Sequence, residues 1–339
     1  MSKDEISRRE LLKILAAGAA TAGVMSGCTH PKESQVNKTA STYQGNPILG
    51  MMPLPQTGPW PTQDPFLFCV HHNDQYPAGT EACGPQSSLA GRQIGQDFSA
   101  LNGWSMYHGS TVPGFPRHPH RGFETITVVD HGIIDHSDSL GAAARYGDGD
   151  VQWLTAGNGI NHAEMFPLLK QEHANPMDFF QIWLNLPAKN KRVAPHFSMF
   201  WDNDIPVVRH EGANGKVTTV RVVAGQYESA KPLNPPPNSW AATDESHVAL
   251  WTIELEPEAT WTLPAAPAQA NRNLYLIGSQ PISIADQSFS DRIRLNLHPE
   301  ASVQIENGPQ KSRLLLLQGK PIGEPVVQHG PFVMNTREE

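Results

Sequence analysis

The chain reads His118-Pro119-His120-Arg121-Gly122-Phe123-Glu124-Thr125 in its first half and Asn161-His162-Ala163-Glu164 further on. Each segment places two side chains that commonly bind metal ions two residues apart. On an extended strand, residues i and i+2 point to the same face, so His118 and His120 project together, as do His162 and Glu164. If the two strands are neighbours in a barrel, three imidazoles and one carboxylate converge. That set suits iron, nickel, copper or zinc better than calcium or magnesium.

Glycine and proline residues crowd both segments and the sequence between them. Frequent glycine and proline residues predict short strands joined by tight turns, as a small antiparallel barrel requires. The residues concerned are Gly114, Pro116, Pro119, Gly122, Gly147, Gly149, Gly157 and Gly159. A pair of histidines at this spacing is common by chance, and it is this setting that favours a metal site.

Four longer motifs resemble the pirin family of bicupins. They are Pro113–Thr125 (PGFPRHPHRGFET), Gly149–Gly157 (GDVQWLTAG), Ile182–Lys189 (IWLNLPAK) and Gly330–Thr336 (GPFVMNT). The resemblance spans residues 60 to 339. It implies an all-β fold of two tandem cupin barrels, each a jelly roll. Residues 59–188 would form the metal-binding N-terminal cupin, and residues 189–339 the C-terminal cupin, which pirins usually follow with a terminal helix that this sequence does not reach.

The resemblance also implies a ligand set. Pirins bind one metal ion, usually taken as iron, through residues that match His118, His120, His162 and Glu164. Cupins in general often use the glutamate that follows the His-x-His pair, and Glu124 occupies that place. Its separation from His120 is even, so it could face inward on the same strand. Glu124 therefore stays open as the rival carboxylate.

Bacterial pirins are implied to act as quercetin 2,3-dioxygenases, which use dioxygen to open a flavonol ring with release of carbon monoxide. Glu164 would then have a catalytic role as well, because it would accept the proton of the flavonol hydroxyl. The alternative is a non-catalytic, redox-responsive metal protein of the cell envelope. A cavity that reaches the metal would favour the enzyme, whereas a structural site would be closed.

The amino terminus predicts export. Ser7-Arg8-Arg9-Glu10-Leu11-Leu12-Lys13 precedes an apolar run from Ile14 to Met25, which is too short for an ordinary membrane span. This pattern resembles a twin-arginine signal, and Met25-Ser26-Gly27-Cys28 resembles a lipoprotein cleavage box. Residues 1–28 would be the signal, read by the twin-arginine export machinery, and a lipid on Cys28 would anchor the protein on the periplasmic side of the membrane.

Export bears on the metal and on the cysteines. Twin-arginine substrates cross the membrane folded, so the metal could be chosen in the cytoplasm, where free copper is scarce. This favours Fe(II), or else nickel or manganese, and leaves copper and zinc as further candidates. Residues 29–58 lack a periodic apolar pattern and predict a flexible tether. Cys69 and Cys83 could form a disulfide in an oxidising compartment, or remain two unpaired thiols.

The remaining features limit the function. The net charge of −8 without a basic run argues against nucleic acid as a partner; we expect a monomer that binds a small phenolic substrate and dioxygen. Strand-like runs lie at 217–223, 248–255, 273–277, 301–305 and 314–317, but this half has no His-x-His pair, so its barrel is expected to lack a metal. His71 and His72 are adjacent and face opposite sides of a strand, which argues against a ligand pair there.

Overall fold

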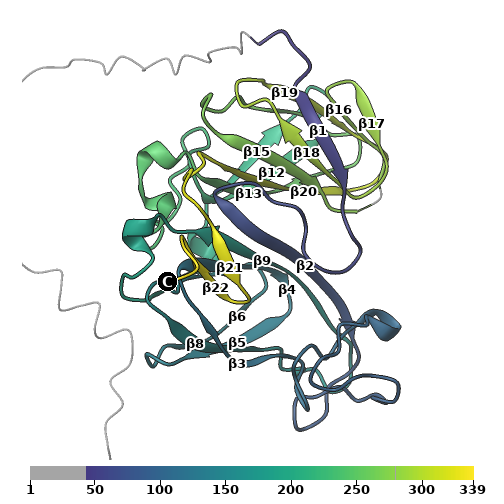
Figure 1. The fold of residues 1–339 in the computed structure, drawn as a ribbon. Coiled ribbons are helices and arrows are strands. Elements are labelled where there is room, and N and C mark those ends of the chain that lie inside the picture. Colours follow the sequence, from purple (N-terminus) through teal and green to yellow (C-terminus); the bar gives the residue numbers. More distant parts are fainter. Residues whose placement is uncertain (1–42, 279) are drawn as a thin grey trace, which may run out of the picture. The chain divides into compact units, whose positions relative to one another are not determined.

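A computed structural model describes residues 43–278 and 280–339 of the protein. Regular structure in these residues is almost entirely strand, arranged in four stacked layers (Figure 1). The helical part of the described chain is limited to short 3-10 turns: η1 (Leu101–Gly103), η2 (Ala188–Asn190), η3 (Asp202–Asp204), η4 (Trp240–Ala242) and η5 (Asp244–Ser246). None of the helices in these residues is long and apolar enough to cross a bilayer. The predicted signal, Cys28 and the first part of the predicted tether lie outside the described residues.

The first barrel is built from two sheets. The larger has the order β10-β7-β4-β9-β2, and the smaller β3-β8-β5-β6. The strands of the larger sheet are β10 (His196–Phe200), β7 (Val151–Thr155), β4 (Phe123–His131), β9 (Asn175–Asn185) and β2 (Phe66–Tyr76). Those of the smaller sheet are β3 (Gly114–His120), β8 (Ile160–Met165), β5 (Ile133–Asp138) and β6 (Ala143–Gly147).

The second barrel repeats this plan. A seven-stranded sheet has the order β1-β18-β15-β20-β13-β12-β11, and a four-stranded sheet the order β14-β19-β16-β17. The first contains β1 (Ile48–Pro53), β18 (Ile293–Leu297), β15 (Asn271–Leu276), β20 (Ser312–Gly319), β13 (Ala249–Leu255), β12 (Val217–Ala224) and β11 (Val207–Glu211). The second contains β14 (Thr260–Leu263), β19 (Val303–Asn307), β16 (Ile282–Ile284) and β17 (Gln287–Phe289). The all-β prediction and the prediction of two barrels are confirmed.

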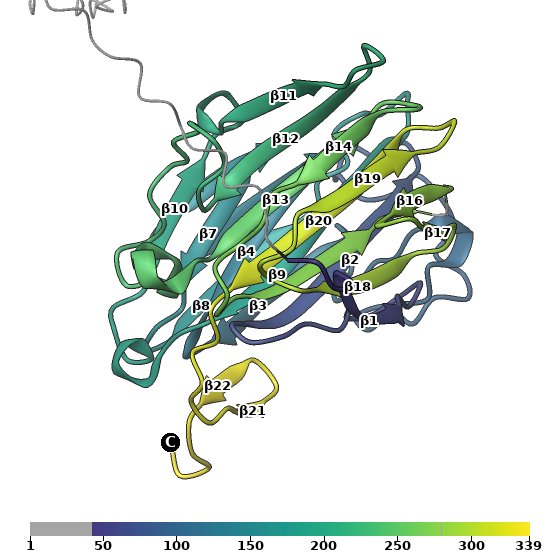
Figure 2. The same cartoon turned by 90° about the horizontal axis from the view of Figure 1, so that it is seen from above.

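Side chains of the two large sheets share one buried core, and the strands of the two sheets overlap in the view from above (Figure 2). Leu314 and Leu316 of β20 point into the second barrel, whereas Leu315 and Leu317 pack with Ile126 and other side chains of the first barrel. A strand that is buried on both faces needs apolar residues at successive positions. This explains the uninterrupted Leu314–Leu317 run.

The segment before the first barrel corrects one prediction. The sequence predicts a tether up to residue 58, but Ile48–Pro53 form β1, which pairs antiparallel with β18 and places Met51 opposite Leu295. The side chain of Ile48 is buried in the second barrel. The tether prediction is wrong for this segment, because pairing with a strand distant in sequence orders a stretch whose own residues give no periodic signal.

The sheets also exchange segments across the predicted domain boundary at residue 188. Strand β10 lies beyond that boundary, yet it pairs with β7 of the first barrel. The hairpin of β21 (Val327–His329) and β22 (Phe332–Met334) returns to the first barrel as well. The Arg121 N–H donates to the Pro331 carbonyl at 3.2 Å, and the Val333 N–H donates to the Arg121 carbonyl at 3.0 Å. The C-terminal segment therefore closes one side of the first barrel.

The two cysteines of the described chain are free thiols. Cys69 is fully buried in the core between the barrels, whereas Cys83 lies half-buried in the long segment between β2 and β3. Burial raises the pKa of the Cys69 thiol above its usual range. Of the two alternatives, the structure shows unpaired thiols, and the disulfide prediction is wrong because one side chain points into the core and the other lies on a loop.

Candidate metal centre and its cavity

The register of two neighbouring strands, β3 and β8, brings the predicted ligands to one face. In the pairing of β3 with β8, His118 lies opposite His162, after an irregularity between Phe115 and His118. His120 follows His118 at i+2, and Glu164 follows His162 at i+2, so all four side chains share the inner face of the small sheet. The structure thus brings together His118, His120, His162 and Glu164.

The imidazole nitrogens meet at close range. His118 Nε2 lies 3.1 Å from His120 Nε2 and 2.9 Å from His162 Nε2. His162 Nε2 lies 3.9 Å from Glu164 Oε2. Two nitrogens that each lie ~2.1 Å from a metal ion, at a right angle, are ~3.0 Å apart. The separations among the histidines therefore fit ligands of one transition metal ion.

The hydrogen bonds of the rings support the same interpretation. His118 Nδ1 lies 2.8 Å from the Pro116 carbonyl, which can only accept, so this nitrogen carries the proton and Nε2 carries a lone pair. His162 Nδ1 is buried and has no hydrogen-bond partner among the described residues. Burial, together with neighbouring imidazoles, holds the pKa of the His120 and His162 rings well below the usual value. Neutral rings whose nitrogens converge in this way fit a bound cation.

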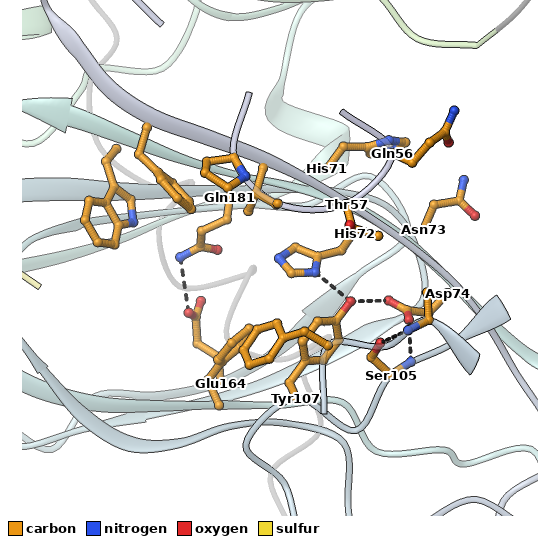
Figure 3. A pocket seen from close by; sticks show the side chains of 18 of the residues that line it. Gln56, Thr57, His71, His72, Asn73, Asp74, Ser105, Tyr107, Glu164 and Gln181 are labelled. Carbon is orange, nitrogen blue, oxygen red and sulfur yellow. Dashed lines mark hydrogen bonds between the residues drawn. The ribbon is translucent and has the colours of Figure 1, made fainter. Parts of the chain in front are cut away.

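Glu164 is held in place by three polar side chains. Its Oε1 accepts hydrogen bonds from Thr127 Oγ1 at 3.1 Å and from the Tyr146 hydroxyl at 3.4 Å. Its Oε2 accepts a hydrogen bond from Gln181 Nε2 at 3.3 Å, the pair drawn in Figure 3. These hydrogen bonds restrain the carboxyl group in a buried position. They orient Glu164 towards the three histidines.

His136 is a further member of the cluster that the sequence analysis missed. It lies opposite Glu164 in the pairing of β5 with β8, and it forms a second group of potential ligands with His162 and Glu164. Its Nε2 lies 3.4 Å from Asp138 Oδ2. The signal was present in the sequence, because His136-Ser137-Asp138 has the same i, i+2 spacing as the two recognised motifs.

Glu124 lies away from this cluster. It is fully buried on β4 and accepts hydrogen bonds from the hydroxyls of Thr155 and of Ser239, which belongs to the second half of the chain. The even spacing from His120 does not hold across the turn at Arg121 and Gly122, where Gly122 has φ +82°. Beyond that turn, Glu124 shares the face of Ile126 towards the second barrel, so it is not placed to serve as the rival ligand.

A cavity of about 1020 Å³ opens onto the cluster. His118, His120 and Glu164 form part of its wall, and aromatic rings form much of the rest near them. The Trp183 ring lies 5.5 Å from His120 and 4.7 Å from Phe68 between centroids, and the Phe115 ring lies 6.2 Å from His118. The volume is at the upper end of the usual range for small-molecule sites. The cluster is therefore reachable by a flat aromatic ligand.

Another part of the cavity wall is polar and belongs partly to the second barrel. Arg292 and Arg313 line it together with His71. His71 Nε2 lies 2.8 Å from Asp178 Oδ1, and Arg313 donates to Asp178 Oδ2 at 2.7 Å. His71 is thus part of a hydrogen-bond network with Asp178 and Arg313 that links the two large sheets, and His72 points to the other side of the strand, as expected for adjacent residues.

Comparisons with known proteins cover most of the described chain. The family model described as Pirin matches residues 60–184, and the one described as Pirin C-terminal cupin domain matches residues 250–339. A Pseudomonas aeruginosa protein provisionally named quercetin 2,3-dioxygenase is 34% identical over 231 residues, 67% of this chain and 74% of its own. Pirin of Homo sapiens is 35% identical over 239 residues, 69% of this chain and 76% of its own.

A solved structure is similar over a larger share of the chain. The crystal structure of quercetin 2,3-dioxygenase from Acinetobacter baumannii aligns with a TM-score of 0.66 at 25% identity, covering 86% of this chain and 93% of that chain. The similarity therefore extends across both barrels.

Proposed function

The chain belongs to the pirin family, and we propose that it is a metal-dependent dioxygenase that acts on a flavonol such as quercetin or on a related phenolic compound. The observation that carries this proposal is the large, aromatic-walled cavity onto which His118, His120 and Glu164 open. A purely structural metal site is enclosed by its ligands. Here three of the predicted ligands line a large cavity, so a substrate that enters the cavity can reach the metal position.

In this proposal, His118, His120, His162 and Glu164 hold one divalent transition metal ion, with Fe(II) favoured. When bound, such an ion lowers the pKa of a coordinated hydroxyl and supports the reaction with dioxygen. Phe68, Phe115 and Trp183 would pack against the flat rings and exclude water from them.

Glu164 is predicted both to ligate and to accept the hydroxyl proton of the substrate. Its oxygens already accept three hydrogen bonds, from Thr127, Tyr146 and Gln181. These hydrogen bonds hold the carboxylate facing the histidines, with Oε2 3.9 Å from His162 Nε2, which is the orientation that a metal ligand requires. The ligand role therefore has more support than the role of base.

The test is oxygen uptake and carbon monoxide release by the Fe(II)-loaded full chain with quercetin. We expect turnover by the unmodified protein and a loss of about 100-fold or more in His162→Ala, because that change removes a central ligand. The matched control is His173→Ala, since His173 is an exposed histidine outside the cavity. Equal turnover in His162→Ala and in the unmodified protein would refute the proposal.

We also propose that the protein works outside the cytoplasm as a lipid-anchored protein. The support is the sequence of residues 1–28, with its paired arginines, its short apolar run and Cys28. Labelling with a radioactive fatty acid in a bacterial host tests the anchor: Cys28→Ala should abolish the label. Retention of the label in that variant would contradict the anchor.

A further inference from the structure

A second group of buried ionisable side chains lies in the same cavity, outside the metal cluster. His72 and Asp74 follow each other at i, i+2 on β2, and Tyr107 comes from the long segment between β2 and β3. His72 Nδ1 lies 2.8 Å from the Tyr107 hydroxyl, and that hydroxyl lies 2.7 Å from Asp74 Oδ2 (Figure 3). The three residues are only 7%, 3% and 7% exposed, in sequence order. They form a continuous chain of hydrogen bonds.

The direction of these hydrogen bonds follows from the number of protons available. The Ser105 N–H donates to Asp74 Oδ1 at 2.9 Å, and the Tyr107 hydroxyl donates its only proton to Asp74 Oδ2. The Tyr107 oxygen must then accept from His72, so the proton of the imidazole sits on Nδ1. His72 Nε2 consequently carries a lone pair.

That lone pair is available to a ligand in the cavity. His72 lines the cavity that Glu164 and Gln181 also line, and its Nε2 has no hydrogen-bond partner among the described residues and is not among their fully enclosed polar atoms. Stacking of the His72 ring on Phe179, with centroids 4.4 Å apart and planes 12° apart, fixes its orientation. In Figure 3 the ring lies between the Gln181–Glu164 pair and Tyr107.

The backbone at Tyr107 gives independent support. Its φ of 56° lies in the left-handed region, which is unfavourable for a bulky aromatic residue. Reciprocal backbone hydrogen bonds with Asp97, each 2.8 Å long, hold Tyr107 in this conformation. Such strain persists where the surrounding structure fixes a side chain for a task. Here it directs the hydroxyl between His72 and Asp74.

We propose that His72, Tyr107 and Asp74 form a proton relay that deprotonates the phenolic substrate. The substrate hydroxyl gives its proton to His72 Nε2, the Nδ1 proton moves to the Tyr107 oxygen, and the Tyr107 proton moves to Asp74 Oδ2. The substrate becomes a phenolate and Asp74 a neutral acid, so atoms and charge balance, and the reverse sequence returns the proton to the product. His72 is the catalytic base. Tyr107 and Asp74 hold its ring in place and take up the proton that leaves Nδ1. The inference rests on the proposed function.

The surroundings of the relay favour storage of the proton on Asp74. Burial raises the pKa of Asp74 to about 7, although its hydrogen bonds and Arg92 oppose the rise, and Asp97 adds to it. Burial, together with His71, lowers the pKa of His72 to about 3, so an imidazolium is not a stable resting state. A proton that enters at His72 therefore passes on to Asp74.

The first test is the pH dependence of kcat/KM for quercetin with the Fe(II)-loaded full chain. The relay requires an ionised Asp74, so activity should rise with pH through about 7. Tyr107→Phe and Asp74→Asn should lower kcat by about 100-fold with little change in KM, and should remove this acidic limb. The matched control is Tyr76→Phe. Tyr76 lies on β2 like His72 and Asp74, and its buried hydroxyl donates to the Ser105 carbonyl. This variant should keep the acidic limb.

A second measurement does not depend on turnover. Nitrogen chemical shifts of the zinc-loaded protein at pH 8 should show that His72 is protonated at Nδ1 alone. Tyr107→Phe should change the protonation of this ring. The thermal unfolding midpoint of the variant should stay above the assay temperature, which shows that it is folded. A His72 protonated at Nε2 in the unmodified protein would overturn the relay. Relay variants with the rate and pH profile of the unmodified protein would overturn it and leave the dioxygenase proposal standing. A complete lack of quercetin turnover would refute that proposal, and the nitrogen shifts would still decide whether His72 is the accepting base.

Discussion

Glu124 shows how the environment of a single side chain decides its role. It follows the His-x-His pair closely in sequence, but its carboxyl group is fully buried between the barrels and bonded to Thr155 and Ser239. The strand rule for residues i and i+2 holds within β3 and within β8, where it predicts the faces of His118 and His162. It fails for Glu124 because the turn at Gly122 begins a new strand with its own alternation.

This burial has a measurable consequence. Burial raises the pKa of Glu124 from 4.5 to about 7, although the hydroxyls of Ser239 and Thr155 oppose the rise. The folded state therefore binds the Glu124 proton more tightly than the unfolded state does. The stabilisation that this proton provides is fully present below about pH 4.5 and is lost as the pH rises through about 7.

We predict that Glu124→Gln, a neutral side chain of similar shape, lacks this loss. The free energy of unfolding of the variant minus that of the unmodified protein should grow by an amount on the order of 3 kcal/mol as the pH rises from 4.5 to 7. Denaturant unfolding at several pH values measures the difference. Parallel stability profiles for the two proteins would show that Glu124 is not the buried acid described here.

At the scale of elements, the β3–β4 turn and the C-terminal hairpin depend on each other. A Cβ at Gly122 would lie 1.9 Å from the Val333 carbonyl oxygen, so only glycine permits this close approach. The buried ammonium of Lys191 donates to the carbonyls of Gly122 and Val333, at 2.8 and 3.3 Å, and to Asn185 Oδ1 at 2.6 Å. These contacts fix the hairpin whose Pro331 lines the cavity.

Lys191→Met should therefore destabilise the fold, since it keeps the apolar stem and removes a donor that three buried acceptors share. We expect a loss of about 2–3 kcal/mol in the free energy of unfolding. Lys189→Met is the matched control because Lys189 is exposed, and it should change stability by less than about 0.5 kcal/mol. Thermal and denaturant unfolding provide the measurement, and equal effects of the two substitutions would contradict this account of the hairpin.

The strands that were predicted each carry their own signal in the sequence. The apolar runs at 217–223 and 314–317 coincide with β12 and β20. Strand β1 was not predictable, because it is ordered by pairing with β18, which is far away in sequence. The same limit applies to the hairpin β21–β22, whose place against Arg121 depends on the folded first barrel.

Across the whole molecule, the two barrels share one core and one cavity. The core between the large sheets joins residues such as Ile126 and Leu315, and the cavity wall includes Arg292 and Arg313 of the second barrel. The predicted boundary at residue 188 therefore does not separate the two barrels cleanly, since residues from both sides of it contribute to the sheet of the first barrel and to the wall of the cavity. The similarity to a solved dioxygenase across both barrels is in agreement with this arrangement.

The candidate site was only partly predictable for the same reason. Four clustered side chains follow from two local motifs and one strand pairing. The hydrogen bond between His72 and Tyr107, by contrast, joins residues 35 positions apart through a segment without regular periodicity. No local pattern in the sequence indicates that contact, and only the folded chain brings the residues together.

The central claim is that His118, His120, His162 and Glu164 hold one metal ion at the wall of the cavity. The most direct measurement is the metal content of the purified full chain by elemental analysis, with His162→Ala and His173→Ala in parallel. We predict about one transition metal ion per chain in the unmodified protein and in His173→Ala. His162→Ala should retain almost none, whereas an undiminished metal content in that variant would contradict the account.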